Sequence, residues 1–323
     1  MPDSGPRPGP NAGFERWTHP SAILVATDLS DLQRLMPFAL EQAGEAGAQL
    51  ILLHVLAAGE GIAVDAAGMP YYDQSGALEF ATKALTPWCE VARRHDVFCD
   101  AVVREGNAAQ QIAATLRQIH ADRVLLGTRS RSRLGKLFLG SVAEQVLRSV
   151  NLPVMTVGPE AHLPVESRDR DRVVLHATTL REASRPSAAL ACQIAAARAA
   201  RLVLLHVLPP KDEMERNGLR TGMDSAAMHE LRSLAKQTGA GCCTAVEPLV
   251  VHGNPSIEIL AAASECRATL IVLGATQRSA FENLTRDRIV YKVLAHARCP
   301  VLTLREPLAE PAELVPESIA THE

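Results

Sequence analysis

The chain repeats itself, because four segments of its first half recur in the same order in its second half. Residues 50–56 read LILLHVL and residues 202–208 read LVLLHVL, so each copy holds the same unbroken apolar run around one histidine. The other three pairs are EGNAAQQI (105–112) and HGNPSIEI (252–259), ADRVLLGT (121–128) and ATLIVLGA (268–275), and LPVMTV (152–157) and CPVLTL (299–304). A repeat of roughly 150 residues has the size of a whole domain, so it predicts two duplicated domains rather than a solenoid of short units.

Within each copy, apolar runs alternate with helical patterns. The first copy contains expected strands at 22–27, 49–55, 98–104, 122–126 and 153–157, and expected helices at 31–46, 76–95, 107–120 and 141–150. The second copy repeats the strands at 172–178, 201–207, 244–251, 269–273 and 300–304. Near-continuous Val, Ile and Leu is typical of parallel strands buried on both faces. The sequence therefore predicts an α/β fold in which each copy is a doubly wound, five-stranded parallel sheet.

Composition sets the expected domain boundaries. The 323 residues suffice for two domains of ordinary size, at 19–158 and 171–305, joined by a charged, proline-containing linker at 159–170. Residues 1–18 are rich in proline and glycine, so we expect a disordered lead there. The glutamate-rich residues 306–323 are expected to form an acidic, disordered tail.

Charge, hydropathy and cysteine content argue against several classes of protein. The formal net charge of -3 argues against bulk nucleic-acid binding, and no apolar run approaches the ~20 residues of a membrane-spanning helix. The seven cysteines form no disulfide framework and no zinc-site spacing. The odd number of cysteines indicates reduced thiols and a cytoplasmic location. Because no spacing resembles a zinc site, we expect no metal site.

A glycine-flanked basic segment connects the fourth expected strand to the following helix. Gly127 ends the strand and Gly140-Ser141 opens the helix, and between them stand four basic residues, Arg129, Arg131, Arg133 and Lys136. A glycine at a strand exit lets a ligand approach the backbone, and the first N–H groups of a helix attract anions. The segment does not fit a P-loop, because its first two glycines are too far apart. We interpret it as a cradle for a chain of phosphates.

The same segment also has an explanation that needs no ligand. Ser141-Val-Ala-Glu144 fits a capping box, in which the serine and glutamate side chains satisfy the first backbone donors of the helix. A basic loop can equally be a solvated surface. The combination of both features directly after a buried strand is what favours phosphate binding.

Asp28 follows the first strand as the glycine-flanked segment follows the fourth. If these strands are neighbours, both features face one crevice at the carboxyl ends of the strands, where α/β sheets bind ligands. Ser30-Asp-Leu-Gln33 fits a capping box for the next helix, so Asp28 is available to a ribose hydroxyl or an adenine amine. The alternative is an ordinary turn residue, since turns favour aspartate.

These residues resemble the pattern of the universal stress protein family, which is glycine, two residues, glycine, nine residues, glycine, then serine or threonine. Here Gly127, Ser130 and Gly140-Ser141 stand at that spacing, and the segments LLHV, GN, GSVAEQVLR and LPV also match. The resemblance covers nearly the whole chain, once per copy. It implies the adenine-nucleotide α-hydrolase-like fold with strand order 3-2-1-4-5. It also implies that domains pair through their last strands, so we expect an intrachain pseudo-dimer, with a homodimer of chains left open.

The resemblance further implies ATP in the crevice of the first copy, with Mg²⁺ as its accompanying ion. The residues expected to flank adenine and ribose are Ala26, Asp28, Val55 and Leu126. Those expected to meet the phosphates are Gly127, Ser130, Gly140, Ser141 and Val142. Ser130 departs from the family's glycine, and its side chain is expected to weaken ATP binding or to reshape the loop.

The second copy departs further from the family pattern. Thr179 stands where Asp28 does, Gln277 fills the second glycine position, and Asp287-Arg288 replaces the Gly-Ser pair. The acidic side chains of Asp287 and Glu282 would oppose bound phosphates. We therefore expect a degenerate site in the second domain.

The leading hypothesis is a cytoplasmic stress-response protein that binds ATP in its N-terminal domain and acts as a nucleotide-dependent signalling or regulatory module. Any hydrolysis is expected to be slow, because no general base or metal-binding acid stands out. The alternative is a protein-interaction scaffold of the same fold that binds an unknown protein partner and no nucleotide. An enzyme of the wider adenine-binding superfamily is disfavoured, because its signatures SGGxDS and HIGH are absent.

Overall fold

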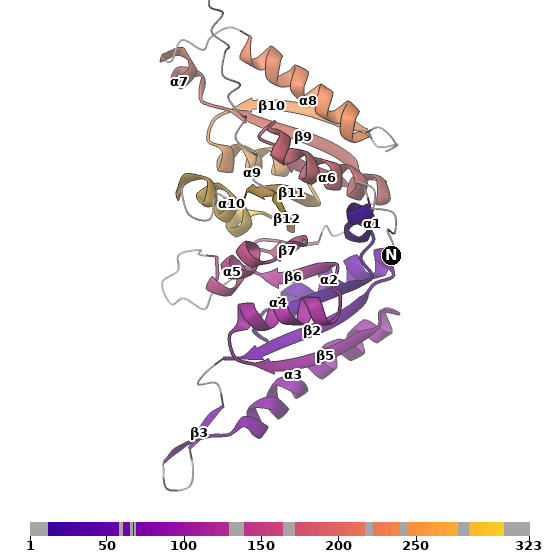
Figure 1. Cartoon of the computed structure of the whole chain (residues 1–323), viewed down its shortest axis with the longest axis vertical. Coiled ribbons are helices and arrows are strands. Elements are labelled where there is room, and N and C mark those ends of the chain that lie inside the picture. Colours follow the sequence, from indigo (N-terminus) through magenta and orange to yellow (C-terminus); the bar gives the residue numbers. More distant parts are fainter. Residues whose placement is uncertain are drawn as a thin grey trace, which may run out of the picture.

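Strands from both halves of the chain form a single ten-stranded sheet, in the order β10-β9-β8-β11-β12-β7-β6-β1-β2-β5 (Figure 1). The structure is a computed structural model that describes residues 12–57, 61–64, 67, 69–128, 139–163, 172–216, 222–239, 245–276 and 284–306. The strands of the first domain are β1 (Ala22–Thr27), β2 (Gln49–Leu56), β5 (Cys99–Glu105), β6 (Arg123–Gly127) and β7 (Val154–Val157). Those of the second domain are β8 (Val173–Ala177), β9 (Arg201–Leu208), β10 (Val246–His252), β11 (Leu270–Thr276) and β12 (Val301–Glu306).

Helices cover both faces of this sheet (Figure 1). The first domain contributes α2 (Leu32–Ala46), α3 (Gln74–Arg94), α4 (Ala108–Gln118) and α5 (Ser141–Ser149). The second contributes α6 (Arg185–Ala197), α7 (Lys211–Arg216), α8 (Met223–Gly239), α9 (Pro255–Glu265) and α10 (Leu284–His296), with a short 3-10 turn at Glu182–Ser184. One apolar core under α2, α3, α6 and α8 runs through both domains, whereas α4 with α5 and α9 with α10 cover separate cores on the other face.

The predicted strand order is confirmed in each half, because β5-β2-β1-β6-β7 and β10-β9-β8-β11-β12 both follow the order 3-2-1-4-5. All strand pairs of the ten-stranded sheet that lie within one half are parallel. The central strand β1 is buried along its whole length, which explains its unbroken apolar sequence. It lies between β2 and β6, so the ends of the first and fourth strands are neighbours, as expected.

The two halves are joined by an antiparallel seam between β7 and β12. Val154, Met155 and Thr156 of β7 pair with Thr303, Leu302 and Val301 of β12. The expected pairing through the last strands therefore occurs within one chain. The sequence predicted two five-stranded sheets, and the seam merges them into one sheet of ten strands.

Helix α1 (Ala12–Thr18) lies within the residues expected to form a disordered lead. It is held at the junction of the domains: the Arg16 guanidinium pairs with the buried Asp122 carboxylate at 2.7 Å, and the Thr18 hydroxyl donates to Gln193 Oε1 of α6 at 3.0 Å. The prediction of disorder is thus wrong for residues 12–18. Local composition could not show these contacts, because their partners are distant in the sequence.

A hairpin of β3 (Ile62–Val64) and β4 (Pro70–Tyr72) follows β2 and projects from the end of the first domain (Figure 1). It was not predicted. Its apolar side chains are exposed, at 62% for Ile62 and 64% for Val64. In the described ranges, no helix combines the length and the apolar character needed to cross a bilayer.

A candidate nucleotide cleft in the first domain

A cleft of about 320 Å³ opens at the carboxyl ends of β1, β2 and β6, between these strands and the starts of α4 and α5. The expected site residues that line it are Ala26, Asp28, Val55, Leu126, Gly127, Gly140, Ser141 and Val142. Ser130 lies outside the described residues, as do the four basic residues of the segment. Further lining residues, not predicted, are Thr27, Asp31, Leu53, His54, Ala57, Ala108, Ile112 and Ala143.

The floor of the cleft is apolar and the sheet register builds it. Ala26 of β1 is paired with Leu53 of β2 on one side and with Leu126 of β6 on the other. Val55 of β2 and the buried Ile112 of α4 extend this surface. This apolar surface, with the small side chain of Ala26 between two leucines, suits a flat ring packed against the sheet.

Helix α5 begins at the cleft with open backbone donors. Its N-cap is Gly140, no side chain of the described residues caps it, and Ser141 is its first helical residue. The Glu144 carboxylate pairs with Arg148 at 2.7 Å. The Ser141–Glu144 capping box is therefore not formed, and the alternative explanation of this helix start is wrong. The N–H groups of Ser141, Val142 and Ala143 belong to the first turn, where no carbonyl of the helix can accept from them.

The two ends of the basic segment are tied together beside the helix start. The Gly140 N–H donates to the Thr128 carbonyl at 3.1 Å, and the Thr128 N–H donates to the Val157 carbonyl at 3.3 Å. These bonds hold the end of β6 and the beginning of α5 at the same edge of the cleft. Thr128 and Gly140, the two described residues that flank the segment, therefore lie next to the open donors of α5.

Asp28 directly follows β1 and lines the same cleft. Its Oδ1 accepts hydrogen bonds from the Ser30 N–H at 2.9 Å and the Ser30 hydroxyl at 2.6 Å. The predicted Ser30–Gln33 capping box is absent, since the N-cap of α2 is Asp31 and its side chain makes no cap bond. Asp28 thus shapes the turn, as the alternative interpretation expected. Its Oδ2 accepts no bond from the described residues, and the side chain is exposed.

Asp31 is the acidic residue of the cleft that sequence reasoning missed. Its carboxylate accepts a hydrogen bond from the Thr27 hydroxyl at 2.5 Å and lies 4.0 Å from the Arg34 guanidinium. Burial, partly offset by the Thr27 bond, raises the pKa of this carboxyl above its usual range, and the nearby Asp28 raises it further. A Cβ at Gly127 would overlap Asp31 Oδ2, so glycine is required there to make room for Asp31.

The corresponding place in the second domain is built differently. The Glu306 carboxylate, at the end of β12, lies against Gly274 so closely that a Cβ there would overlap it. Helix α10 begins at Leu284, so Asp287-Arg288 lies inside its first turns, whereas Gly140-Ser141 stands at the start of α5. The Thr179 hydroxyl bonds to the Ser184 hydroxyl at 2.7 Å. Gln277 and Glu282 lie outside the described residues.

Comparison with known proteins gives the same family for both halves. The model of the universal stress protein family matches residues 21–158 and 172–305. A universal stress protein of Methanocaldococcus jannaschii is 26% identical over 136 residues, which are 42% of this chain and 80% of that protein. One of Thermus aquaticus is 33% identical over 144 residues, which are 42% of this chain and 96% of that protein.

Solved structures of two-domain length show the same fold. A universal stress protein from Archaeoglobus fulgidus superposes with a TM-score of 0.68 at 20% identity, and the match covers 88% of this chain and 98% of that one. A functionally unknown protein from Pseudomonas aeruginosa gives a TM-score of 0.60 at 16% identity, covering 90% of this chain and 95% of that one. At these identities the likeness establishes the architecture.

Proposed function

Since this chain belongs to the universal stress protein family, we propose that its first domain binds ATP, as the magnesium complex, in the cleft described above. Occupancy of this cleft would regulate a stress response, and the second domain would act as a structural partner. The observation that carries this proposal is an apolar floor placed between an exposed carboxylate and an uncapped helix start.

Each part of ATP has a chemically suitable surface in the cleft. Ala26, Val55 and Leu126 offer apolar area to the adenine ring. Asp28 Oδ2 can accept a hydrogen bond from a ribose hydroxyl while Oδ1 stays bound to Ser30. The open N–H groups at the start of α5, together with the Ser141 hydroxyl, suit the phosphates.

Magnesium is part of the proposal for an electrostatic reason. Asp28 and Asp31 place two carboxylates in the cleft, and a triphosphate would be repelled by them. A hard divalent cation bound to phosphate oxygens would offset this repulsion. In the described ranges no three His, Cys, Asp or Glu side chains form a metal site of their own. The cation would therefore bind with the nucleotide and not before it.

A scaffold that binds a protein partner is the second candidate, and the β3–β4 hairpin favours it. Its exposed apolar side chains include Ile62, Val64 and Met69, with Tyr71 and Tyr72 half exposed. Such a patch is typical of an interaction surface. Under this alternative, Asp28 serves only to form the turn at Ser30, and Gly127 serves only to make room for the Asp31 carboxylate. The cytoplasmic location stays a prediction under both candidates.

The substitution Gly140→Asp tests the phosphate assignment without threatening the fold. Gly140 has φ -62° and ψ 144°, which any residue can adopt, and aspartate is a favoured N-cap. The variant should therefore be as stable as the parent or more so. Its added carboxylate would stand where the phosphates bind, so we expect Kd for ATP to rise roughly tenfold or more. Gly44→Asp, in α2 with open space around it, makes the same chemical change away from the cleft and serves as the control.

Two measurements decide between the candidates. The purified protein is denatured and released adenine nucleotide is sought by chromatography, and the nucleotide-free protein is titrated calorimetrically with ATP and magnesium. Binding by the parent and by Gly44→Asp, but not by Gly140→Asp, supports the proposal. A parent protein that neither carries nor binds ATP favours the scaffold, and a Gly140→Asp variant that binds like the parent refutes the assignment of the phosphates to α5.

A further inference from the structure

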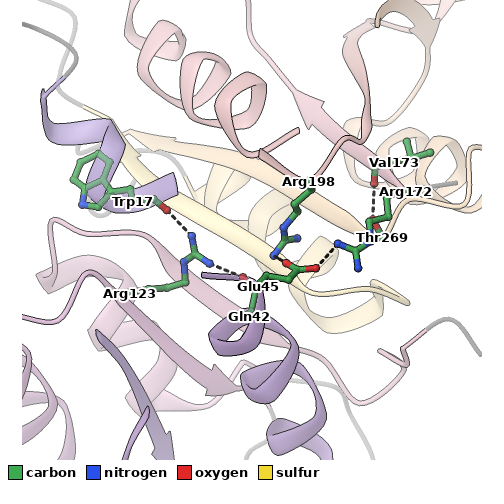
Figure 2. Close-up of polar contacts among 8 residues, drawn as sticks. All are labelled: Trp17, Gln42, Glu45, Arg123, Arg172, Val173, Arg198 and Thr269. Atoms are coloured by element: carbon green, nitrogen blue, oxygen red, sulfur yellow. Dashed lines mark hydrogen bonds and ion pairs between the residues drawn. The ribbon is translucent and has the colours of Figure 1, made fainter. Parts of the chain in front are cut away.

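We infer that a small cavity at the junction of the two domains binds a monovalent anion, chloride, beside Arg123, whose polar contacts Figure 2 shows. The cavity measures about 30 Å³ and lies away from the nucleotide cleft. Gln42, Glu45 and Arg123 line it from the first domain, and Arg198 lines it from the second. The inference does not depend on the proposed function, because no residue of the cleft takes part in it.

Arg123 carries a buried positive charge with neutral partners. It is the first residue of β6 and is only 3% exposed. Its guanidinium donates to Gln42 Oε1 and to the Trp17 carbonyl of α1, both of which are uncharged acceptors (Figure 2). No carboxylate of the described residues pairs with it, and its Nε has no hydrogen-bond partner there. A buried charge is costly unless an opposite charge compensates it.

Two of the three nearby acids, Glu45 and Asp122, are already engaged by other cations. Glu45 accepts from Arg198 at 3.0 Å and also from Arg172, so one carboxylate serves two guanidinium groups (Figure 2). Asp122, next to Arg123 in sequence, accepts instead from Arg16 and Ser21. Besides the Arg16–Asp122 pair, the cluster holds three arginines, Arg123, Arg172 and Arg198, against two acids, Glu45 and Glu41, so positive charge is in excess.

Burial of their charges lowers the pKa of both arginines at the cavity. Burial lowers the pKa of Arg123 to about 9 and the charge of Arg198 lowers it further, although the carboxylates of Glu45 and Asp122 oppose the shift. Burial also lowers the pKa of Arg198, although Glu45 and Glu41 oppose the shift. Glu41, the remaining acid near the cluster, has its own pKa raised by burial. An anion between the two arginines would relieve both shifts at once.

Size and donor set restrict the anion. A cavity of this volume holds one or about two water-sized particles, so phosphate, carboxylate metabolites and nucleotides are too large. The available donors are guanidinium N–H groups, which bind anions readily. Chloride is small enough for the cavity and accepts hydrogen bonds from guanidinium N–H groups in its ordinary charged form.

The first experiment measures thermal unfolding of the full chain in sodium chloride and in sodium gluconate at equal ionic strength. Gluconate is too large for the cavity. Binding to the folded state alone should raise the parent's Tm by about 2–4 °C as chloride replaces gluconate. Arg123→Met should abolish this difference. Arg201→Met, which breaks the exposed pair with Glu247, is the matched control and should keep it. A difference that persists in Arg123→Met, or none in the parent, overturns the inference.

The second experiment locates the ion and needs no variant. Crystals of the parent protein are grown in sodium bromide and anomalous scattering is measured at the bromine edge. We expect a peak between the Arg123 and Arg198 guanidinium groups. A cavity that holds water alone, or protein atoms, refutes the inference, even where Arg123→Met fails to fold.

Discussion

Glu306 is a buried acid whose ionisation should control the stability of the chain. It ends β12 and is 2% exposed. Its carboxylate accepts a hydrogen bond from the buried Ser187 hydroxyl of α6 and lies against the Gly274 backbone. No cation of the described residues pairs with it. Burial, partly offset by the Ser187 bond, raises its pKa to about 7.

The sign and size of the effect on stability follow from the pKa values of Glu306 in the unfolded and the folded chain. An unfolded glutamate titrates near 4.5, so the folded state holds its proton to higher pH than the unfolded state does. The stability that the neutral carboxyl contributes is complete below about pH 4.5 and is lost as the pH rises through about 7. A shift of this size corresponds to about 3 kcal/mol in the free energy of unfolding.

Glu306→Gln tests this reasoning, because the amide stays neutral at every pH and can still accept from Ser187. Urea unfolding is followed between pH 5 and pH 8 for the parent and the variant. The parent should lose about 2.5 kcal/mol over this range relative to the variant, so that the variant is the more stable protein at pH 8. Glu247→Gln, at an exposed ion pair, is the control. Parallel pH curves for the parent and Glu306→Gln would refute a buried, proton-holding Glu306.

Two further changes test other contacts. Gly127→Ala forces a Cβ onto the Asp31 carboxylate, so we expect a loss of about 1–3 kcal/mol in stability by urea unfolding; a fully stable variant would mean that Asp31 is not packed there. Asp122→Asn removes the acceptor charge of Arg16, and should cost about 1–3 kcal/mol at pH 7. Burial alone would raise the pKa of Asp122, but the bonds from Ser21 and Arg16 outweigh it and lower the pKa, so this contribution is present above about pH 3.8 and is lost as the pH falls further. Equal unfolding curves for Asp122→Asn and the parent at pH 7 would contradict the α1 anchor.

The sequence predicted the sheet well because its strands are specified locally. Unbroken runs such as 22–27 and 49–55 match β1 and β2 to within one residue, since strands buried on both faces tolerate little else. The internal repeat then predicted the strands of the second domain from those of the first. The place of the cleft followed from the strand order, and that order came from the family resemblance.

The failures have physical causes that capping and spacing patterns do not show, namely a competing local hydrogen bond at Ser30 and partners distant in sequence elsewhere. The capping box at Ser30 does not form because its hydroxyl bonds to Asp28 instead. Gly127 is required by the carboxylate of Asp31, which no spacing rule identifies. Helix α1 depends on Asp122, more than 100 residues away. The role of Ser130 stays a prediction, because it lies outside the described residues.

The seam between β7 and β12 has a consequence for how the two halves could diverge. A pair of identical chains must carry the same residues in both members, so any change that spoils one ligand site spoils the other. Covalent fusion removes this constraint, and it keeps the two members together at every dilution. The second half could exchange its Gly-Ser pair for Asp287-Arg288 and place a carboxylate over Gly274 while still supplying the strand that completes the sheet. Fusion thus lets one half specialise while the other preserves the architecture.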